Sequence, residues 1–196
     1  MIRVEGLKKS YDGTVVIDGL DLAIGKGEKT AILAPSGCGK TTLLRLLAGF
    51  EKPDAGRVTV DGKAAFLFQE VRLFPDFDVL ENVAAVLDGK DAKKNAAAWL
   101  VRVGLSGAEH KYPDELSGGM AQRAALARAL ALDRPILYMD EPFKGLDAGS
   151  KSALYALVKE VCAEKTLLLV THDEEEARIL CQRILRFGPG MLPSGE

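Results

Sequence analysis

Residues 29–50, KTAILAPSGCGKTTLLRLLAGF, join an apolar stretch, a glycine-rich turn and a second apolar stretch. Residues 30–34 predict a short buried strand, and the leucine-rich residues 40–48 predict a helix packed on most sides. Between them, APSGCGKTT has the GxxxxGK[ST] pattern of a phosphate-binding loop in the required strand, loop and helix context, except that Ala34 takes the place of the first glycine. The segment therefore predicts a site for a polyphosphate.

Each residue type in this loop suits phosphate binding. Gly37 and Gly39 let backbone N–H groups point inward, and the following helix offers its positive N-terminus. Lys40 can reach the terminal phosphates, the Thr41 hydroxyl can ligate Mg²⁺, and the Thr42 hydroxyl can bond the α-phosphate. The alternative interpretation is a glycine-rich turn without a ligand.

Ala34 is compatible with this loop if its φ is negative and costs stability if its φ is positive. We expect near-normal nucleotide affinity. A large gain in affinity on Ala34→Gly would contradict that expectation.

Composition limits the class of protein. A chain of 196 residues with 47% hydrophobic content suits one α/β domain with a small subdomain. A net charge of −2 and a pI near 5.8 give no electrostatic footprint for nucleic acid. Three cysteines without metal spacing favour a reducing cytosolic compartment. With no signal-peptide core and no run of 18 apolar residues, we expect no membrane insertion by the chain itself.

Two carboxylates follow the apolar residues 136–139, which predict a central parallel strand. Ligands of open α/β sheets lie at the carboxyl ends of the strands. Asp140 therefore suits the Mg²⁺ shell, and Glu141 suits orienting or deprotonating the attacking water. The alternative is that both acids cap the next segment.

A histidine ends the next buried strand, predicted over residues 166–171. At this position His172 can donate a hydrogen bond to a terminal phosphate, although a structural histidine is the alternative. The acidic residues 173–176 are explained by the helix dipole that they precede.

The remaining segments complete an α/β pattern with a mostly parallel core. Residues 2–24 predict two short strands around a polar turn at 8–14. Residues 57–60 and 64–68 predict two strands, and Asp61-Gly62 between them is a strong hairpin signal.

Residues 79–132 have helical patterns, with breaks at 88–89 and 104–113. Within them Ser117 is a good N-cap for a long alanine-rich helix, and Gly118 and Gly119 leave its N-terminus open to an anion. Residues 183–187 predict a last strand, and the tail 188–196 is expected to fray.

Over residues 3 to about 187 the chain resembles the nucleotide-binding domain of ABC transporters. Six motifs in the family's order carry the resemblance: APSGCGKTT (34–42) resembles the Walker A loop, Gln69 the glutamine of the Q-loop, LSGGM (116–120) the signature, ILYMDE (136–141) the Walker B strand, Leu146-Asp147 the D-loop and His172 the switch histidine.

The resemblance implies a P-loop NTPase fold with a mostly parallel core sheet, an N-terminal antiparallel β part and an inserted helical subdomain. The whole chain, 1–196, would be a single ABC-type ATPase domain. Its RecA-like core would comprise 1–78 and 134–187, its helical subdomain about 79–133, and its tail 188–196.

The resemblance also implies ATP and Mg²⁺ as cofactors and assigns residues to them. Catalytic roles go to Glu141, His172, Lys40 and Gln69, and the metal site to Thr41, Gln69 and Asp140. The ATP-binding residues implied are Tyr11 stacked on adenine with Val16 beside it, Ser36, Gly37, Cys38, Gly39, Lys40, Thr41 and Thr42 around the phosphates, and Ser117, Gly118 and Gly119 on the γ-phosphate bound to the opposite subunit.

The sequence departs from the family pattern in three ways. Ala34 replaces a glycine, and Met120 stands where the signature usually has glutamine. The connection 61–63 is short for the family. Because the chain ends soon after the last expected strand, we expect no C-terminal regulatory domain.

The function implied is an ATP-hydrolysing subunit that couples closure of a homodimer, or of a pair with a similar ATPase, to transport through a separate membrane permease. Residues 71–84, VRLFPDFDVLENVA, resemble the importer region that grips a permease helix, so the resemblance favours import, with a solute-binding protein as a further partner. The subunit would lie on the cytoplasmic face of the membrane.

Two other functions stay open from the sequence. One is a soluble ABC-type ATPase in translation or DNA maintenance, although such proteins usually carry two ATPase domains or a coiled-coil insertion. The other is an ATP-binding regulator without turnover, against which Lys40, Asp140, Glu141 and His172 argue.

Overall fold

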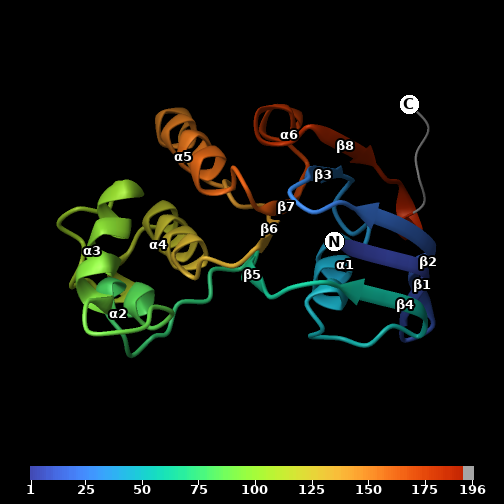
Figure 1. Cartoon of the computed structure of the whole chain (residues 1–196), viewed down its shortest axis with the longest axis horizontal. Coiled ribbons are helices and arrows are strands. Elements are labelled where there is room, and N and C mark those ends of the chain that lie inside the picture. Colours follow the sequence, from blue (N-terminus) through green and yellow to red (C-terminus); the bar gives the residue numbers. More distant parts are fainter. Residues whose placement is uncertain (192–196) are drawn as a thin grey trace.

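A computed structural model describes residues 1–191 of the chain. The strands form two sheets: an antiparallel sheet in the order β2-β1-β4 and a five-stranded sheet in the order β5-β6-β7-β3-β8. Figure 1 shows the antiparallel sheet at one end of the molecule, the five-stranded sheet in the middle and a group of helices at the other end.

The antiparallel sheet is built on the N-terminal hairpin. Strands β1 (Ile2–Tyr11) and β2 (Thr14–Ile24) meet at a two-residue turn in which Asp12 and Gly13 have φ values of 49° and 79°. Two successive positive φ values give the turn the twist that a tight hairpin requires. The strands are therefore longer, and the turn shorter, than expected from the polar residues 8–14.

The five-stranded sheet carries the phosphate loop. Its strands are all parallel: β5 (Ala64–Leu67), β6 (Ile136–Asp140), β7 (Thr166–Thr171), β3 (Lys29–Leu33) and β8 (Arg183–Arg186). Every residue of β6 and β7 is buried, as the expectation of central parallel strands requires. Alternate side chains of β6 enter two different cores, with Leu137 and Met139 in one and Ile136 and Tyr138 in the other.

Strand β4 (Ala55–Val60) does not form the expected hairpin with β5. It pairs instead with β1, with Ile2 opposite Val60, whereas β5 pairs in parallel with β6. Residues 61–63 therefore connect two sheets, and the backbone N–H of Asp61 donates to the carbonyl of Met1 (2.9 Å). The hairpin prediction was wrong because an Asp-Gly pair favours a local turn but does not select a pairing partner.

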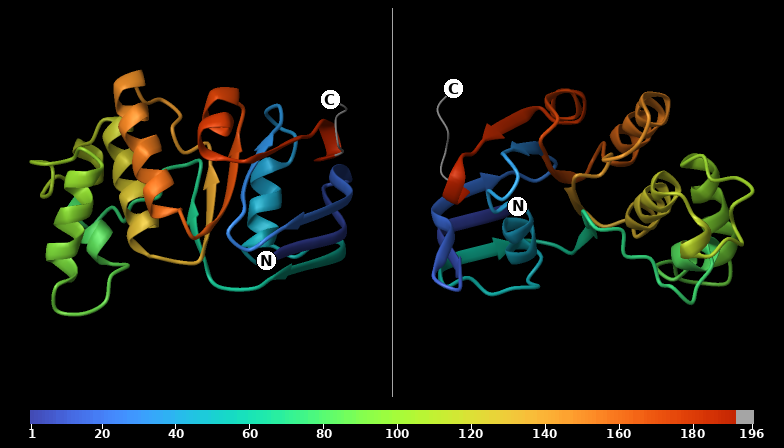
Figure 2. Two further views of the ribbon diagram at one scale, coloured as in Figure 1. Left: turned by 45° about the horizontal axis from the view of Figure 1, so that its top comes forward. Right: turned by 180° about the vertical axis from the view of Figure 1, so that it is seen from behind.

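Three helices lie between β5 and β6 in the sequence: α2 (Val79–Ala84), α3 (Ala92–Arg102) and α4 (Gly118–Ala131), with a 3₁₀ turn at Pro113–Glu115. Asp78 and Glu81 form a capping box at the start of α2. Two further views show these helices at the end of the molecule away from β1, β2 and β4 (Figure 2). The domain boundaries given above stay a prediction.

Helices α1 (Lys40–Leu47), α5 (Ala148–Val161) and α6 (Glu174–Leu180) follow β3, β6 and β7. Each helix therefore begins near the carboxyl end of a parallel strand. Their N-termini and the strand ends define the edge of the sheet at which an α/β protein binds its ligands.

The segment after β8 packs against the phosphate loop. The Cys38 thiol donates to the carbonyl of Gly188, and Met191, in a short 3₁₀ helix (Pro189–Met191), is fully buried in the same core as Cys38. The expectation of a frayed tail was thus wrong for residues 188–191, because these contacts order them. Residues 192–196 of that expected tail lie outside the described residues.

Candidate functional site

The phosphate loop connects β3 to α1. Gly37 and Gly39 have φ values of 79° and 97°, which favour glycine. A Cβ on Gly39 would lie 2.9 Å from both Cγ1 and the carbonyl oxygen of Val16. The loop therefore requires glycine at 39 for space as well as for backbone conformation.

Lys40 is held inside this loop. It is 7% exposed, and its ammonium donates to the carbonyls of Ala34 (2.7 Å) and Pro35 (2.9 Å). Ala34 is not among the residues with positive φ, so the alanine is sterically compatible with the loop. Ala34 therefore meets the condition under which alanine in place of the family's glycine does not strain the backbone.

A cavity of about 290 Å³ opens beside the loop. It brings together side chains from the hairpin, the loop, the end of β5 and the end of β6. Its lining residues are Tyr11, Val16, Ser36, Gly37, Gly39, Lys40, Thr41, Thr42, Gln69 and Glu141. Residues that the sequence assigned to one ligand thus face one cavity, although they span 130 positions of the chain.

Tyr11 stands at the rim of this cavity and is 39% exposed. Its hydroxyl donates to Glu51, and the Lys9 ammonium lies 5.1 Å from the centre of its ring. Partial burial, together with the hydrogen bond to Glu51, raises the pKa of the Tyr11 hydroxyl. The ring is therefore fixed by two charged neighbours at the mouth of the cavity.

Asp140, at the end of β6, faces the first residues of α1. The Thr41 hydroxyl donates to its Oδ2 (2.6 Å), while its Oδ1 is buried and has no hydrogen-bond partner within residues 1–191. Burial raises the pKa of the Asp140 carboxyl. A buried carboxylate oxygen without a partner is rare and indicates a place for a cation or water.

The donor set fits Mg²⁺ in particular. Asp140 and Thr41 offer hard oxygen ligands and are joined by a hydrogen bond, and Thr41 and Gln69 line the phosphate-loop cavity. Within the described part of the chain, no group of three His, Cys, Asp or Glu side chains could hold a metal alone. Mg²⁺ is typically bound through one or two carboxylates together with substrate phosphates, so the site suits a metal that arrives with a nucleotide.

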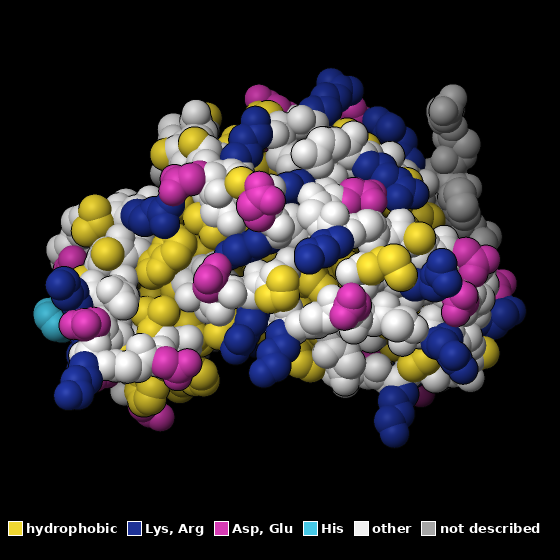
Figure 3. Space-filling view, viewed as in Figure 1, with side chains coloured by type: hydrophobic (Ala, Val, Ile, Leu, Met, Phe, Trp, Pro, Cys, Tyr) yellow, Lys and Arg dark blue, Asp and Glu magenta, His cyan; other side chains and the backbone are white. Residues whose placement is uncertain are grey.

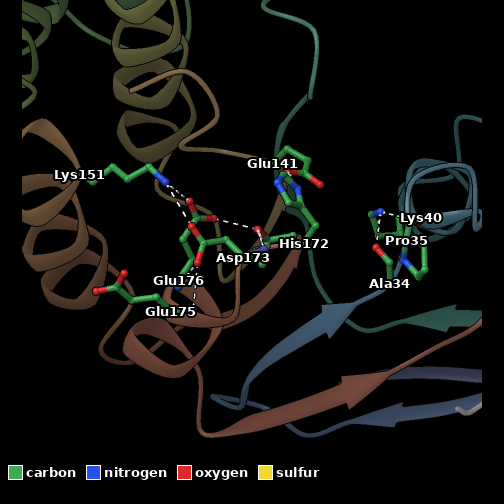
Figure 4. A network of polar contacts seen from close by, with 10 residues as sticks. Ala34, Pro35, Lys40, Glu141, Lys151, His172, Asp173, Glu175 and Glu176 are labelled. Atoms are coloured by element: carbon green, nitrogen blue, oxygen red, sulfur yellow. Dashed lines mark hydrogen bonds and ion pairs between the residues drawn. The ribbon is translucent and has the colours of Figure 1, made fainter. Parts of the chain in front are cut away.

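Glu141 and His172 meet at the ends of the neighbouring strands β6 and β7. Nδ1 of His172 lies 2.7 Å from Oε2 of Glu141, which is 6% exposed. Glu141 has a φ of 49°, and its backbone N–H donates to the carbonyl of Val170 (2.9 Å). Figure 4 shows the two side chains together, with Lys40 of the phosphate loop across from them.

Neither carboxylate after β6 caps a helix. The N-cap of α5 is Asp147, whose side chain accepts from the backbone N–H of Ser150 (2.9 Å). The capping alternative for Asp140 and Glu141 is therefore wrong. Their side chains are instead available to contact a ligand or a metal.

The acidic residues after His172 divide into two groups. Asp173 caps α6, accepting from the N–H groups of Glu175 and Glu176, which agrees with the expected dipole role. The Glu176 side chain differs, because it is 3% exposed and accepts from the Thr171 hydroxyl (2.9 Å) and from the Lys151 ammonium (2.8 Å).

This contact of Glu176 was missed from the sequence. Burial disfavours the charged Lys151 ammonium, but the hydrogen bond and charge of Glu176 outweigh it, and the pKa of Lys151 is raised. Lys151 also approaches Asp173 (3.3 Å), as Figure 4 shows. The network fixes the first turn of α5 against the loop that carries His172, and no local sequence signal pairs Lys151 with Glu176.

Ser117, Gly118 and Gly119 form the start of α4, where the Ser117 hydroxyl accepts from the N–H of Met120 (3.3 Å). The N-cap expected at Ser117 is confirmed. None of the three lines the phosphate-loop cavity. Cys38 does not line it either, because its thiol turns toward Gly188.

Comparisons with known proteins agree with this geometry. The ABC transporter family matches residues 17–144. The aliphatic sulfonates import ATP-binding protein SsuB 3 of Paraburkholderia xenovorans is 48% identical over 193 residues, which cover 97% of this chain and 78% of that protein. SsuB 1 of Streptomyces avermitilis is 45% identical over 193 residues, 97% of this chain and 74% of its own.

Solved structures give the same result. A dimeric post-hydrolysis state of the ATP-binding cassette MJ0796 bound to ADP and Pi has a TM-score of 0.92 and 30% identity, covering 100% of this chain and 98% of that chain. A second dimeric structure of this bacterial ABC transporter cassette has a TM-score of 0.91 and 31% identity, covering 97% and 95%. No helix within residues 1–191 is long and apolar enough to cross a bilayer. The chain therefore belongs to the ABC transporter family and is one of its ATP-binding, ATP-hydrolysing subunits.

Proposed function

We propose that this subunit, as a dimer, couples ATP binding and hydrolysis to the import of a solute through a separate membrane permease. The observation that carries the proposal is the cavity in which the phosphate loop, Gln69 and Glu141 face one another, with His172 in contact with Glu141. The names of the relatives, which are import ATP-binding proteins, support import.

Each residue in and beside the cavity has a role in hydrolysis. Backbone N–H groups of the loop and Lys40 bind the phosphates, and Tyr11 and Val16 receive the adenine. Thr41, Gln69 and Asp140 would hold Mg²⁺, which when bound would neutralise phosphate charge. Glu141 orients a water molecule toward the γ-phosphorus and takes its proton as the bond to ADP breaks. His172 holds the Glu141 carboxylate and faces the γ-phosphate.

The start of α4 completes a site in the partner subunit. Ser117, Gly118 and Gly119 present a helix N-terminus that lies away from the cavity of their own chain. A helix N-terminus binds anions, and the similar solved cassettes are dimers. A head-to-tail dimer would set this terminus of each chain on the γ-phosphate bound by the other.

The permease would contact the loop after Gln69. Val71, Phe74 and Phe77 are all more than a third exposed, and the loop is held by Asn82, whose side chain accepts from the Phe74 N–H (2.7 Å) and donates to the Phe77 carbonyl (2.9 Å). A rigid apolar loop suits a partner helix. Through it the subunit would sit on the cytoplasmic face of the membrane, with a solute-binding protein as the further component of the importer.

Surface charge gives no support for nucleic acid as a partner. On the face shown in Figure 3, Lys and Arg side chains alternate with Asp and Glu, in keeping with a net charge of −2. Nucleic-acid-binding domains instead gather basic residues on one face. The soluble alternative in translation or DNA maintenance therefore has no observation in its favour.

Trapping the ATP-bound dimer tests the proposal. In Glu141→Gln the phosphate loop is intact, so ATP should bind, turnover should fall about a hundredfold to ten-thousandfold, and size-exclusion chromatography with ATP and Mg²⁺ should show a dimer. Lys40→Ala should show neither binding nor dimer. Undiminished turnover by Glu141→Gln would remove Glu141 from its role.

The same trapped variant tests the partner. Tagged Glu141→Gln, held with ATP and Mg²⁺ in a detergent extract of its source cells, should copurify a polytopic membrane protein. The matched control is Lys40→Ala under the same conditions. Recovery of ribosomal or DNA-associated proteins alone would favour the soluble alternative over transport.

A further inference from the structure

Glu51 joins two parts of the nucleotide site that lie far apart in the sequence. Its Oε2 accepts from the Tyr11 hydroxyl at the end of β1, and its Oε1 lies 3.5 Å from Nη1 of Arg45 on α1. Tyr11 lines the phosphate-loop cavity, whereas Glu51 does not. Glu51 therefore reaches the cavity only through the side chain of Tyr11.

The connection between α1 and β4 is tied to the end of β1. The Asp54 carboxylate accepts from the backbone N–H of Ser10 (2.6 Å) and from the Lys9 ammonium (3.1 Å). The same ammonium donates to the carbonyl of Lys52 (3.1 Å). These contacts hold the connection, and the glutamate that it carries, beside the end of β1.

A nucleotide keeps its base and its phosphates within a distance limited by its covalent structure. Tyr11 belongs to the antiparallel sheet, while the phosphate loop follows β3 of the five-stranded sheet, and Figure 1 shows α1 beside the antiparallel sheet. Binding both parts of the ligand at once therefore depends on how the tyrosine ring is held relative to α1. Tyr11 is 39% exposed, so its ring has room to turn unless its hydroxyl is held.

We propose that Glu51 is a positioning residue that holds the Tyr11 ring in the orientation that stacks on the base of the nucleotide. The inference rests on the proposed function, in which Tyr11 receives the adenine. The Glu51 side chain is 23% exposed, so most of its surface, and with it the hydrogen bond to the hydroxyl, is shielded from water. Arg45 orients the carboxylate from the side of α1. Glu51 thus acts on binding of the base and not on transfer of the phosphate.

Binding of ADP, compared with binding of inorganic tripolyphosphate, tests this role, because tripolyphosphate has phosphates but no base. In isothermal titration calorimetry with Mg²⁺, Glu51→Leu and Tyr11→Phe should each bind ADP about fivefold more weakly, the loss expected for one hydrogen bond. Both should bind tripolyphosphate as the unmodified chain does. Glu51→Gln, whose amide oxygen can still accept from the hydroxyl, should bind ADP within about twofold of the unmodified chain. In turnover, Glu51→Leu should raise KM for ATP with little change in kcat.

Further variants show whether the effect passes through Tyr11. Tyr11→Phe/Glu51→Leu should bind ADP no more weakly than either single variant, because both changes remove the same hydrogen bond. Arg45→Met removes the ion pair but leaves the acceptor for the hydroxyl, and should bind ADP within about twofold of the unmodified chain. Glu160→Leu, which removes a glutamate from the exposed pair with Arg102, should bind both ligands normally. Additive losses, equally weakened tripolyphosphate binding, or normal ADP binding by Glu51→Leu would overturn the proposal.

Tyr11→Ala separates this inference from the proposed function on which it rests. Loss of the ring should weaken ADP binding more than Glu51→Leu does, and should leave tripolyphosphate binding unchanged. Normal ADP binding by Tyr11→Ala would contradict the adenine assignment, and the role of Glu51 with it. Weakened ADP binding by Tyr11→Ala together with normal binding by Glu51→Leu would contradict the role of Glu51 alone.

Discussion

Nδ1 of the His172 imidazole lies 2.7 Å from Oε2 of Glu141, at the ends of two adjacent parallel strands. The backbone of Glu141 has a φ of 49°, a left-handed conformation that costs energy in a residue with a side chain. The turn after β6 thus directs the Glu141 carboxylate toward His172. The strained backbone that does so lowers the free energy of unfolding.

This strain can be measured with two variants that both lack the carboxylate. Glu141→Gly should be more stable than Glu141→Ala, because glycine adopts a positive φ freely, and the gain from relieved strain is about 1 kcal/mol, reduced by the larger unfolded-state entropy of glycine. Urea unfolding of both variants measures the difference, and both should lack ATPase activity. An alanine variant equal to or more stable than the glycine variant would show that the turn is unstrained.

Asp140 gives a prediction for the dependence of stability on pH. Burial raises its folded-state pKa, so the unfolded chain releases the proton at lower pH than the folded chain does. The resulting loss of stability is absent below the ordinary carboxyl pKa, grows as pH rises, and is complete above the raised pKa. Asp140→Asn should therefore be the more stable protein in urea at pH 7.5, and the difference should shrink toward pH 4.5.

ATP with Mg²⁺ supplies the control for that comparison. It should stabilise the unmodified protein, whose Asp140 gains a cation nearby, and should stabilise Asp140→Asn much less. A stability difference that is the same at both pH values would show that the Asp140 charge is not the cause.

The contact between Lys151 and Glu176 gives a prediction about coupling. Glu176 is 3% exposed, so Lys151→Met leaves a buried carboxylate without its cation and should destabilise the protein by about 2 kcal/mol, below the value for a fully buried pair because Lys151 is partly exposed. The double variant Lys151→Met/Glu176→Gln should recover part of this loss. Purely additive losses in urea unfolding would argue against a coupled pair.

ATP turnover shows whether the Lys151–Glu176 network also positions His172 or only stabilises the fold. Thr171 and Asp173 flank His172, and both contact the Lys151–Glu176 pair. We therefore expect Lys151→Met to lower kcat at temperatures where the variant stays folded, with little change in KM for ATP. The exposed pair Arg102 and Glu160 (2.7 Å) supplies a matched control, since Arg102→Met should leave both parameters unchanged.

Ala34 gives a prediction of a small effect. Its φ is not positive and its carbonyl accepts from Lys40, a backbone contact that glycine would keep. Ala34→Gly should leave the Kd for ATP within about twofold and destabilise the protein by about 0.5 to 1 kcal/mol through the more flexible unfolded chain. Titration with ATP and thermal unfolding measure the two effects, and a large gain in affinity would show that the alanine obstructs the loop.

Local sequence signals accounted for the strands and helices and for the side of the sheet where the ligand residues gather. The phosphate loop has a strand before it and a helix after it, and Asp140 and His172 follow buried apolar runs, so parallel pairing brings them to one edge. The cavity is lined by most of the predicted site residues, although Asp140 and His172 are not among its lining, and the roles assigned to all of them stay predictions.

The features that we could not predict from the sequence depend on contacts between distant segments. The partner of β4 is β1, whose paired residues lie 47 to 58 positions earlier, and no turn signal reports such a choice. Likewise the order of residues 188–191 comes from contact with Cys38, some 150 positions away, and the partner of Glu176 is on another helix. In each case the contact joins segments that are far apart in the sequence, and the local pattern of neither segment indicates its partner.

The position of Met191 has a practical consequence for handling this protein. The residue lies fully buried beside the phosphate loop, with its Cγ 3.2 Å from where a Cβ on Gly39 would be. A shortened chain that ends before Met191 would remove this side chain from beside the loop, so shortened forms of the protein should keep residues 188–191.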